Sequence, residues 1–307
     1  MNKFKISIIG AGAVGSTLAQ RVLDSGLADV VLVDIVKNMA FAKALDMADA
    51  APIVGTERSI IGTDSYKDIE SSDIVIITAG FPRKPGMTRE ELIAKNAAIV
   101  REVSNNIKMH APSSIVIVVT NPLDTMTYLA HKTLGFKKEK VFGMAGVLDA
   151  SRFIYLLSDE LKVKRSSVET YILGSHGDTM VPVLSKTKIG GKPIARLLSK
   201  EKIEAIVRRT RDRGAEIVGL LGSGSAYYSP SAAVFKIISA VIKNSKETLV
   251  VSAYLNGEYG LQDLYIGVPC KIGKSGIEKI VELELAEDEA LALKMSAQAI
   301  KSSHEKL

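Results

Sequence analysis

A glycine-rich segment near the start of the chain is the first candidate for chemistry. Its residues, Gly10-Ala11-Gly12-Ala13-Val14-Gly15, fit the pattern G-x-G-x-x-G between a predicted strand and a predicted helix, which is the context of a dinucleotide fingerprint. There Gly10 permits a tight turn, Gly12 lets the backbone approach a pyrophosphate and Gly15 lets helix and strand pack closely. The pattern predicts a phosphate site at the helix N-terminus, where free N–H groups attract anions.

A carboxylate at the end of the second predicted strand supports this interpretation. Asp34 stands 19 residues after Gly15, where dinucleotide-binding folds place the carboxylate that binds the adenosine ribose hydroxyls. The same charge repels a 2′-phosphate, so the sequence favours NAD over NADP as the cofactor. The alternative is an aspartate that merely ends a strand, and the glycine segment upstream makes this the weaker hypothesis.

A histidine, an aspartate and an arginine form a second group of candidates. His176 lies in Gly174-Ser175-His176-Gly177, directly after a predicted buried strand, and the glycines let its side chain stand exposed at the edge of a cleft. Asp149 begins a predicted helix, and Arg152 lies three residues later on the same helical face. Asp149 could also serve as a simple helix N-cap.

Two further segments follow predicted strand ends, the edge at which doubly wound sheets bind ligands. Residues 79–89 combine Gly, Pro and basic side chains, and Thr88 with Glu91 has the pattern of a capping box. This predicts a closing loop, although a solvated basic loop explains the composition equally well. Asn121-Pro122 offers a polar side chain on an extended or turned backbone.

The elements that position these residues differ between the two halves. In the first half, β-branched runs without polar alternation predict strands buried on both faces at 6–9, 30–33, 74–78 and 115–119. A further strand is predicted at 140–143, with helices at 15–24, 37–51 (ended by Pro52) and 89–110. This alternation is the βαβ signature of a parallel sheet.

The second half has an α+β pattern without a second dinucleotide motif. Its predicted elements are a helix at 149–161, a strand at 168–173, a hairpin region at 181–194, helices at 199–221 and 231–243, strands at 249–255 and 265–272 and a closing helix at 287–303. We therefore predict an α/β protein in which residues 1–145 form an NAD-binding Rossmann domain with a doubly wound parallel sheet. Residues 146–307 form an α+β catalytic domain.

Composition and charge exclude several other classes of protein. The 307 residues are 47% hydrophobic and 24% charged, which is ordinary globular usage. The single cysteine, Cys270, excludes an internal disulfide framework and a Cys-rich zinc site, and no metal site is predicted. No apolar stretch reaches the ~20 residues of a membrane span, and no leader pattern precedes the first strand, so a cytoplasmic protein is expected.

The net charge of +6 is spread over the whole chain. Residues 1–144 carry 17 basic and 15 acidic side chains, and residues 145–307 carry 23 and 19. The densest basic run, at 208–213, lies in a predicted helix with interleaved acids and is interpreted as a solvated or subunit-facing surface. The chain has no Trp and no interleaved basic and aromatic residues, so nucleic-acid binding is disfavoured.

Taken together, the segments resemble the lactate/malate dehydrogenase family, and within it the malate dehydrogenases that are similar to lactate dehydrogenases. The resemblance covers essentially the whole chain and rests on five segments: residues 10–15, residues 79–89, Val119-Thr120-Asn121-Pro122, Asp149-x-x-Arg152 and residues 174–178. It implies an NAD-dependent oxidoreductase that interconverts (S)-malate and oxaloacetate. It also implies a homodimer or homotetramer, with the helices at 37–51 and 199–221 as expected interface faces.

The resemblance also implies roles for the candidate residues. His176 would be the general acid/base, and Asp149 would hold its tautomer and favour its charged form. Arg152 would bind the C1 carboxylate of the substrate through two parallel hydrogen bonds. Arg89 would stabilise charge on the carbonyl oxygen as the loop closes, and Asn121 would hydrogen-bond the substrate. Cofactor contacts are implied for Asn96 and for the backbone of Val119, Thr120 and Asn121, and the peptide before Pro122 is expected to be cis.

Substrate choice depends on Arg83, where the family's malate enzymes carry Arg and its lactate enzymes carry Gln. A second guanidinium suits the additional carboxylate of a dicarboxylate, and it would be left unpaired by pyruvate. The segment 222–230 lacks the Thr-Ser-Trp sequence of the lactate enzymes, which favours the same choice. The alternatives are a lactate or other 2-hydroxyacid dehydrogenase and an NAD-binding sensor without catalysis.

Overall fold

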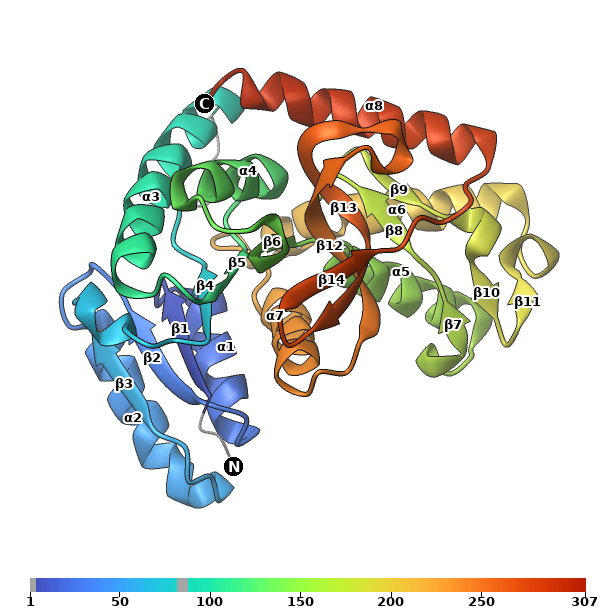
Figure 1. The fold of residues 1–307 in the computed structure, drawn as a ribbon. Helices are drawn as coiled ribbons and strands as arrows, with labels where there is room; N and C mark the ends of the chain where they lie inside the picture. The colour runs from blue at the N-terminus through green and yellow to red at the C-terminus, as the bar shows by residue number, and fades with distance from the viewer. Residues whose placement is uncertain (1–3, 82–87) are drawn as a thin grey trace.

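One large sheet runs through both halves of the chain (Figure 1). The computed structural model describes residues 4–81 and 88–307, apart from the side chain of Arg89. In this part of the chain eleven strands form the large sheet, whose main path has the order β3-β2-β1-β4-β5-β6-β12-β13-β8-β9, and β14 pairs with β13. Three short strands form a separate sheet of order β11-β10-β7.

The first six strands of this path are parallel, and all of them except β3 were predicted from the sequence. They are β1 (Lys5–Ile9), β2 (Asp29–Val33), β3 (Ile60–Thr63), β4 (Ile74–Ile77), β5 (Ile115–Val118) and β6 (Val141–Met144). Every residue of β4 and β5 is buried, which explains why these strands show no polar alternation. The strand order and the helical crossovers confirm the predicted α/β class with a doubly wound sheet.

Helices cover both faces of the parallel strands. The core on one face includes residues of α1 (Ala13–Asp24), α2 (Met39–Val54) and α7 (Tyr228–Ile242). The core on the other face includes residues of α3 (Arg89–His110) and α4 (Leu123–Leu134). The carboxyl ends of the strands between these layers remain free to carry the site.

Residues 146–307 extend the sheet with antiparallel strands. Their helices are α5 (Gly146–Leu161), α6 (Lys200–Leu221), α7 and α8 (Glu287–His304). Their strands are β7 (Val168–Glu169), β8 (Ile172–Gly174), β9 (Met180–Pro182), β10 (Lys188–Ile189), β11 (Lys192–Pro193), β12 (Glu247–Asn256), β13 (Gln262–Gly273) and β14 (Gly276–Ile280). Strand β12 is antiparallel to β6, and α8 brings the C-terminus back to α3, where Arg101 donates a hydrogen bond to the Leu307 carbonyl (Figure 1).

Several local predictions need correction. The expected end of a helix at Pro52 is wrong, because α2 continues to Val54 and ends at Gly55, which has φ +72°. Pro52 lies in the last turn, where the missing N–H removes only one helical hydrogen bond. The single strand predicted at 168–173 is two strands, since β7 pairs with β10 and β8 pairs with β13 and β9. The cis peptide expected before Pro122 is present.

Candidate active site

The glycine loop between β1 and α1 is tightly packed at its two ends and open in the middle. Gly10 has φ +108°, and a Cβ on Gly15 would lie 1.9 Å from the Gly10 carbonyl oxygen, so no other residue fits without movement of the backbone. A Cβ on Gly12 would meet no atom within 4 Å. The loop therefore has the close helix–strand packing expected at Gly15, and it leaves space beside Gly12 for a ligand.

The N-terminus of α1 at this loop has the character of an anion site. Its N-cap, Gly12, offers no side-chain cap, and the first turn has no acidic residue, so the free N–H groups and the helix dipole face outward without compensation. Asp34 follows β2 and accepts hydrogen bonds from the N–H of Ala11 at 2.6 Å and the N–H of Val36 at 2.8 Å. These residues fit a dinucleotide, with its pyrophosphate at the helix and a ribose beside the carboxylate.

His176 and Asp149 form a hydrogen-bonded pair across two elements. His176 follows β8, Asp149 lies in the first turn of α5, and His176 Nδ1 and Asp149 Oδ2 are 2.8 Å apart. The carboxylate is almost fully buried, whereas the imidazole keeps 15% of its side-chain surface exposed. A hydrogen bond through Nδ1 leaves Nε2 as the nitrogen that can exchange a proton with a substrate.

The surroundings of His176 favour its charged form. Burial alone lowers the pKa of an imidazole, but the charge of Asp149 and its hydrogen bond act in the opposite direction, and together they raise the pKa of His176. The nearby guanidinium of Arg152 opposes them by a smaller amount. The pair is therefore suited to hold a proton on the imidazole and to exchange it with a substrate.

Arg152 lies on the other side of the Asp149 carboxylate. Its Nη1 is 3.5 Å from Asp149 Oδ1, and its side chain is only 11% exposed. Nε is buried and has no hydrogen-bond partner within the described residues. Burial lowers the pKa of Arg152, but a guanidinium stays protonated in proteins. A buried cation with unused donors is the group that binds a carboxylate in two parallel hydrogen bonds.

A second buried carboxylate, Asp124, holds the main chain of His176 and was missed by the sequence analysis. Its Oδ2 accepts a hydrogen bond from the His176 N–H at 3.2 Å, and its Oδ1 accepts one from Ser252 Oγ at 2.6 Å. Asp124 is 3% exposed, and burial raises its pKa. One feature of the sequence could have indicated Asp124. It is a charged residue three positions after Asn121, in a segment whose other residues are uncharged.

The carboxyl ends of β4 and β5 are joined by Asn96 of α3. The Asn96 side chain is fully buried. Its Nδ2 donates to the carbonyls of Phe81 and Asn121, and its Oδ1 accepts from the Phe81 N–H. Thr120 Oγ1 similarly donates to the Ala79 carbonyl at 2.6 Å. Both N–H groups of the Asn96 amide are thus used within the protein, and its hydrogen bonds position Phe81 and the exposed Asn121.

Two of the expected site residues lie beyond the described structure. Arg83 belongs to the segment 82–87, which lies outside the described residues, and so does the side chain of Arg89. The backbone of Arg89 begins α3, and Thr88 and Glu91 form the predicted capping box.

The basic run at 208–213 is not simply a solvated surface. Arg211 donates a hydrogen bond to the Met180 carbonyl at 3.2 Å, close after His176 in the chain. Arg213 is half-buried, pairs with Glu216 at 2.9 Å and adds to the positive charge around Arg152. Parts of α6 therefore belong to the walls of the site, because α6 packs against α5 there.

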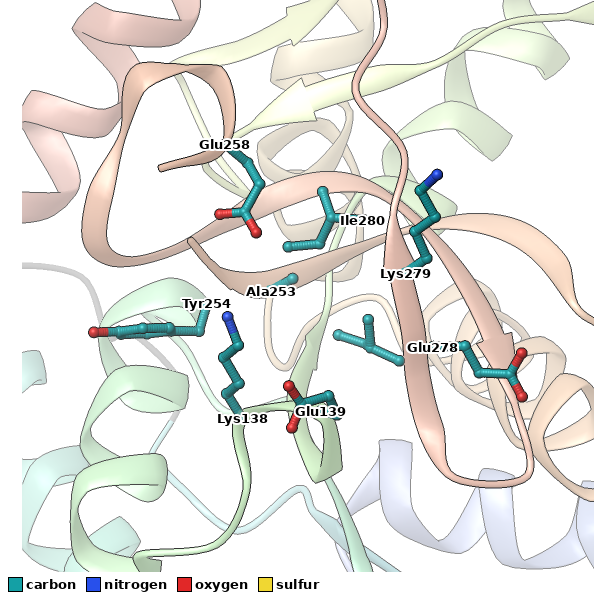
Figure 2. Close-up of a pocket in the computed structure, with 9 residues that line it drawn as sticks. Lys138, Glu139, Ala253, Tyr254, Glu258, Glu278, Lys279 and Ile280 are labelled. Carbon is teal, nitrogen blue, oxygen red and sulfur yellow. The ribbon is translucent and has the colours of Figure 1, made fainter. Parts of the chain in front are cut away.

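A hollow elsewhere on the molecule contains none of these residues. The cavity has a volume of about 180 Å³. Figure 2 shows the residues that line it, which come from β12, β14, the segment before β6, where Lys138 lies, and the turn after β12, where Glu258 lies. Lys138 Nζ lies over the Tyr254 ring at 5.9 Å, and Glu258 accepts a hydrogen bond from the Asn256 N–H. These two charged groups are therefore engaged with neighbours in the protein.

Among the helices within residues 4–81 and 88–307, none combines the length and the apolar character needed to cross a lipid bilayer. The same part of the chain contains no group of three or more His, Cys, Asp or Glu placed to bind a metal ion.

Comparison with known families agrees with this geometry. Residues 4–143 match the NAD-binding domain of lactate/malate dehydrogenases, and residues 146–307 match the alpha/beta C-terminal domain of the same enzymes. The chain belongs to the lactate/malate dehydrogenase family. It therefore carries the NAD-binding domain of this family, and the resemblance inferred from the five sequence segments is confirmed.

Individual members of the family are similar over almost their whole length. A malate dehydrogenase of Methanosarcina barkeri is 51% identical over 299 residues, which cover 97% of each chain. The crystal structure of Cryptosporidium parvum malate dehydrogenase superposes with a TM-score of 0.97 at 41% identity and covers 100% of this chain and 99% of its own. A lactate dehydrogenase of the same organism, complexed with lactic acid and NAD, has a TM-score of 0.97 at 39% identity, with 99% and 98% covered.

Proposed function

We propose that this member of the family is an NAD-dependent malate dehydrogenase, which interconverts (S)-malate and oxaloacetate. The observation that carries the proposal is the triad of His176, Asp149 and Arg152, in which one buried carboxylate lies between an imidazole and a guanidinium. A proton-transfer group beside a carboxylate-binding group is what a 2-hydroxy acid requires. The relatives named malate dehydrogenase support the choice of substrate.

Proton transfer is assigned to His176. During oxidation its Nε2 accepts the proton of the substrate hydroxyl, and during reduction it returns this proton to the carbonyl oxygen. Asp149 holds Nδ1–H and stabilises the imidazolium, in accordance with the raised pKa of His176. Asp124 is a positioning residue, because it holds the main chain of His176 and does not face the substrate.

Three arginines and an asparagine are assigned to the dicarboxylate. Arg152 binds the C1 carboxylate with its free donors, and the exposed Asn121 hydrogen-bonds the reacting oxygen. Arg89 stabilises the charge that develops on this oxygen. Arg83 pairs with the second carboxylate. These last two roles are implied by the resemblance of residues 79–89 to the family's loop.

The cofactor is assigned to the carboxyl edge of the parallel strands. Residues Gly10 to Gly15 receive the pyrophosphate, Asp34 binds the adenosine ribose, and the backbone of Val119, Thr120 and Asn121, held by Asn96, lines the nicotinamide side. When bound, NAD supplies the group that accepts or gives up the hydride, while the protein supplies position and charge. Residues 1–145 then form the cofactor domain and residues 146–307 the catalytic domain.

Turnover of oxaloacetate and pyruvate, measured side by side with NADH and with NADPH, tests the proposal. We expect rapid oxidation of NADH with oxaloacetate, little with pyruvate, and weak use of NADPH because Asp34 repels its 2′-phosphate. Arg83→Gln should greatly lower oxaloacetate turnover and admit pyruvate, since a missing partner in a polar site changes discrimination by up to roughly 10⁴.

A lactate or other 2-hydroxyacid dehydrogenase is the second candidate, favoured by the similarity to a lactate dehydrogenase. A preference of the unaltered protein for pyruvate would support it. An NAD-binding sensor would bind NADH and turn over neither substrate.

We also propose that the protein is a homodimer or homotetramer located in the cytoplasm. On α2 the side chains of Phe41 and Leu45 are 45% and 68% exposed, and on α6 Leu220 is 83% exposed. Apolar side chains gathered on two helices are typical of a subunit interface. Sedimentation equilibrium should give a multiple of the 32.9 kDa chain mass, whereas a monomer would refute the assignment of these faces. Cell fractionation tests the location.

A further inference from the structure

Lys43 of α2 reaches the glycine loop, although no sequence motif singles it out. Its Nζ donates a hydrogen bond to the carbonyl oxygen of Ala11 at 2.5 Å and lies 3.4 Å from Ser16 Oγ. The N–H of the same Ala11 donates to Asp34 Oδ2 at 2.6 Å. The residue between the first two glycines is therefore held from both sides, by a carboxylate after β2 and by an ammonium from α2.

The position of this ammonium is electrostatically unusual in the protein alone. Ser16 belongs to the first turns of α1, and the N-terminus of α1 already has partial positive charge, no capping side chain and no acidic residue in its first turn. A cation near the positive end of a helix is unfavourable unless an anion lies between or beside them. The neighbouring Asp34 compensates only in part, since its oxygens bind the N–H groups of Ala11 and Val36 and form no ion pair with Lys43 within the described residues.

An anion at the open side of the loop would remove this excess of positive charge. The loop is open beside Gly12, since a Cβ on this residue would meet no atom within 4 Å. A pyrophosphate in this space would bring two negative charges. Lys43 thus has two separable properties: a hydrogen bond that fixes the loop, and a charge that favours phosphate.

We propose that Lys43 is a positioning residue for the cofactor, which holds the glycine loop through Ala11 and selects the pyrophosphate by its charge. The proposal rests on the NAD site described above. It also concerns coenzyme choice. The carboxylate of Asp34 rejects a 2′-phosphate, whereas the nearby ammonium attracts one, so the preference for NAD depends on Asp34 prevailing over Lys43.

Binding measurements with graded ligands separate the two properties. Lys43→Gln keeps a hydrogen-bond donor and loses the charge, Lys43→Arg keeps both, and Lys43→Met loses both. Lys67→Met, at an exposed lysine in the same half of the chain, is the control for net charge. NADH binding is followed by fluorescence, and binding of ADP, AMP and adenosine by calorimetry.

We expect Lys43→Gln to weaken NADH and ADP roughly tenfold to a hundredfold, the range for a charge-assisted contact, while adenosine changes less than about threefold. Lys43→Arg should restore most of the affinity, and Lys67→Met should leave it unchanged. The difference between the unaltered protein and Lys43→Gln should shrink at about 1 M salt, where charges are screened within ~3 Å.

Equal weakening of ADP and adenosine in Lys43→Gln would overturn the proposal, because it would show a purely structural role of the side chain. Unchanged ADP affinity would overturn it as well. If Lys43→Met fails to fold, the Gln and Arg variants still decide the question. Failure of the unaltered protein to bind NADH would instead refute the proposed function, so the two failures are distinguishable.

Coenzyme choice gives an independent result. We expect Asp34→Ser to bind NADPH more tightly than the unaltered protein does. If the ammonium attracts the 2′-phosphate, the increase in NADPH affinity should be at least about tenfold smaller in the double variant Asp34→Ser/Lys43→Gln. Equal gains in the single and double variants would contradict a role of Lys43 in coenzyme choice.

Discussion

Replacement of Asp149 by Asn tests the assignment of the acid/base pair most directly. The substitution keeps the size of the side chain and a hydrogen-bond acceptor for His176 Nδ1, and it removes the negative charge that lies 2.8 Å from this nitrogen. Because Asp149 is 1% exposed, water cannot replace the lost charge easily. The imidazolium form of His176 should therefore lose most of its stabilisation.

The magnitude follows from the geometry of the pair. With the two charge centres roughly 4 Å apart, an effective dielectric constant of about 20 gives an attraction of about 4 kcal/mol. This corresponds to about three factors of ten in an equilibrium or rate constant. Since asparagine retains the hydrogen bond, we expect kcat for oxaloacetate reduction near pH 7 to fall by roughly 10² to 10³.

The pH dependence has a definite sign. Reduction needs a proton on His176, so its rate falls as the pH rises through the pKa of this residue. In the unaltered protein Asp149 outweighs burial and raises that pKa. In Asp149→Asn burial is opposed only by the weaker influence of Asp124 and by the hydrogen bond that asparagine retains, so the pKa of His176 should be lower. The rate should therefore fall at a lower pH. Oxidation, which needs the neutral imidazole, should persist to lower pH.

The assay is kcat/KM for oxaloacetate and for malate between about pH 5 and 9, the range in which histidines titrate, with NADH binding as a check on folding. Asp159→Asn is the matched control, since Asp159 lies on the same helix but is exposed and paired with Lys162 at 3.1 Å. It should change neither rate nor profile. A folded Asp149→Asn variant with the pH profile of the unaltered protein would refute the assignment of this pair.

Three further predictions concern buried polar groups. Ser252→Ala removes the donor to the buried Asp124, and it should lower the free energy of unfolding in urea by about 1 to 3 kcal/mol; an unchanged value would contradict the importance of this hydrogen bond. Burial lowers the pKa of His304 to about 4. As the pH falls, His304 is therefore protonated in the unfolded chain before it is protonated in the folded protein. Because the imidazole is partly exposed, solvent screens part of the effect. The associated stability is present above about pH 6.5 and is lost as the pH falls toward 4. Unfolding of His304→Gln at pH 7 and pH 4.5 should show a smaller difference than in the unaltered protein, and an equal difference would exclude His304 as the cause. Burial raises the pKa of the Cys270 thiol well above its ordinary value, so a thiol reagent should label it only after unfolding, and rapid labelling of the folded protein would contradict its burial.

The parallel half of the fold was predictable because its central strands are buried on both faces. A run such as Ile74–Ile77 has no polar residue, and only a central strand of a covered sheet requires this pattern. Strand β3 (Ile60–Thr63) was missed because it lies at the edge of the sheet, exposes Ile61 and contains a glycine. Helix α4 (Leu123–Leu134) was missed because Asn121-Pro122 was interpreted only as a turn, although Pro122 is the N-cap of the helix.

The antiparallel half was predicted less completely, because its pairings are not local. Residues 168–173 have the composition of one strand, yet Val168 pairs with Ile189 and Gly174 pairs with Gly267. Only tertiary structure decides that the chain leaves one sheet and enters another between them. The strand β14 (Gly276–Ile280) similarly depends on its pairing with β13.

Within the site, the sequence indicated residues that belong to short motifs and did not indicate those that support them. The glycine loop and the His176 segment have characteristic neighbours in the chain. Asp124 and Lys43 do not, because their importance comes from partners 52 and 32 residues away, the His176 N–H and the Ala11 carbonyl. Many solvated carboxylates and ammonium groups occupy similar helical positions, so only the burial of Asp124 and the contact of Lys43 with Ala11 distinguish these two.

The position of His176 is determined jointly by both halves of the chain. Its side chain is held by Asp149, which begins the second half, and its main chain is held by Asp124 from the first. Asp124 is held in turn by Ser252, whose strand β12 pairs with β6 at Gly143, where a Cβ would lie 3.0 Å from the Ser252 Cβ. A rotation of one half against the other would break the two hydrogen bonds of a buried carboxylate, which is costly. The continuous sheet, rather than a hinge between domains, therefore fixes the distance between the cofactor loop and the proton-transfer group.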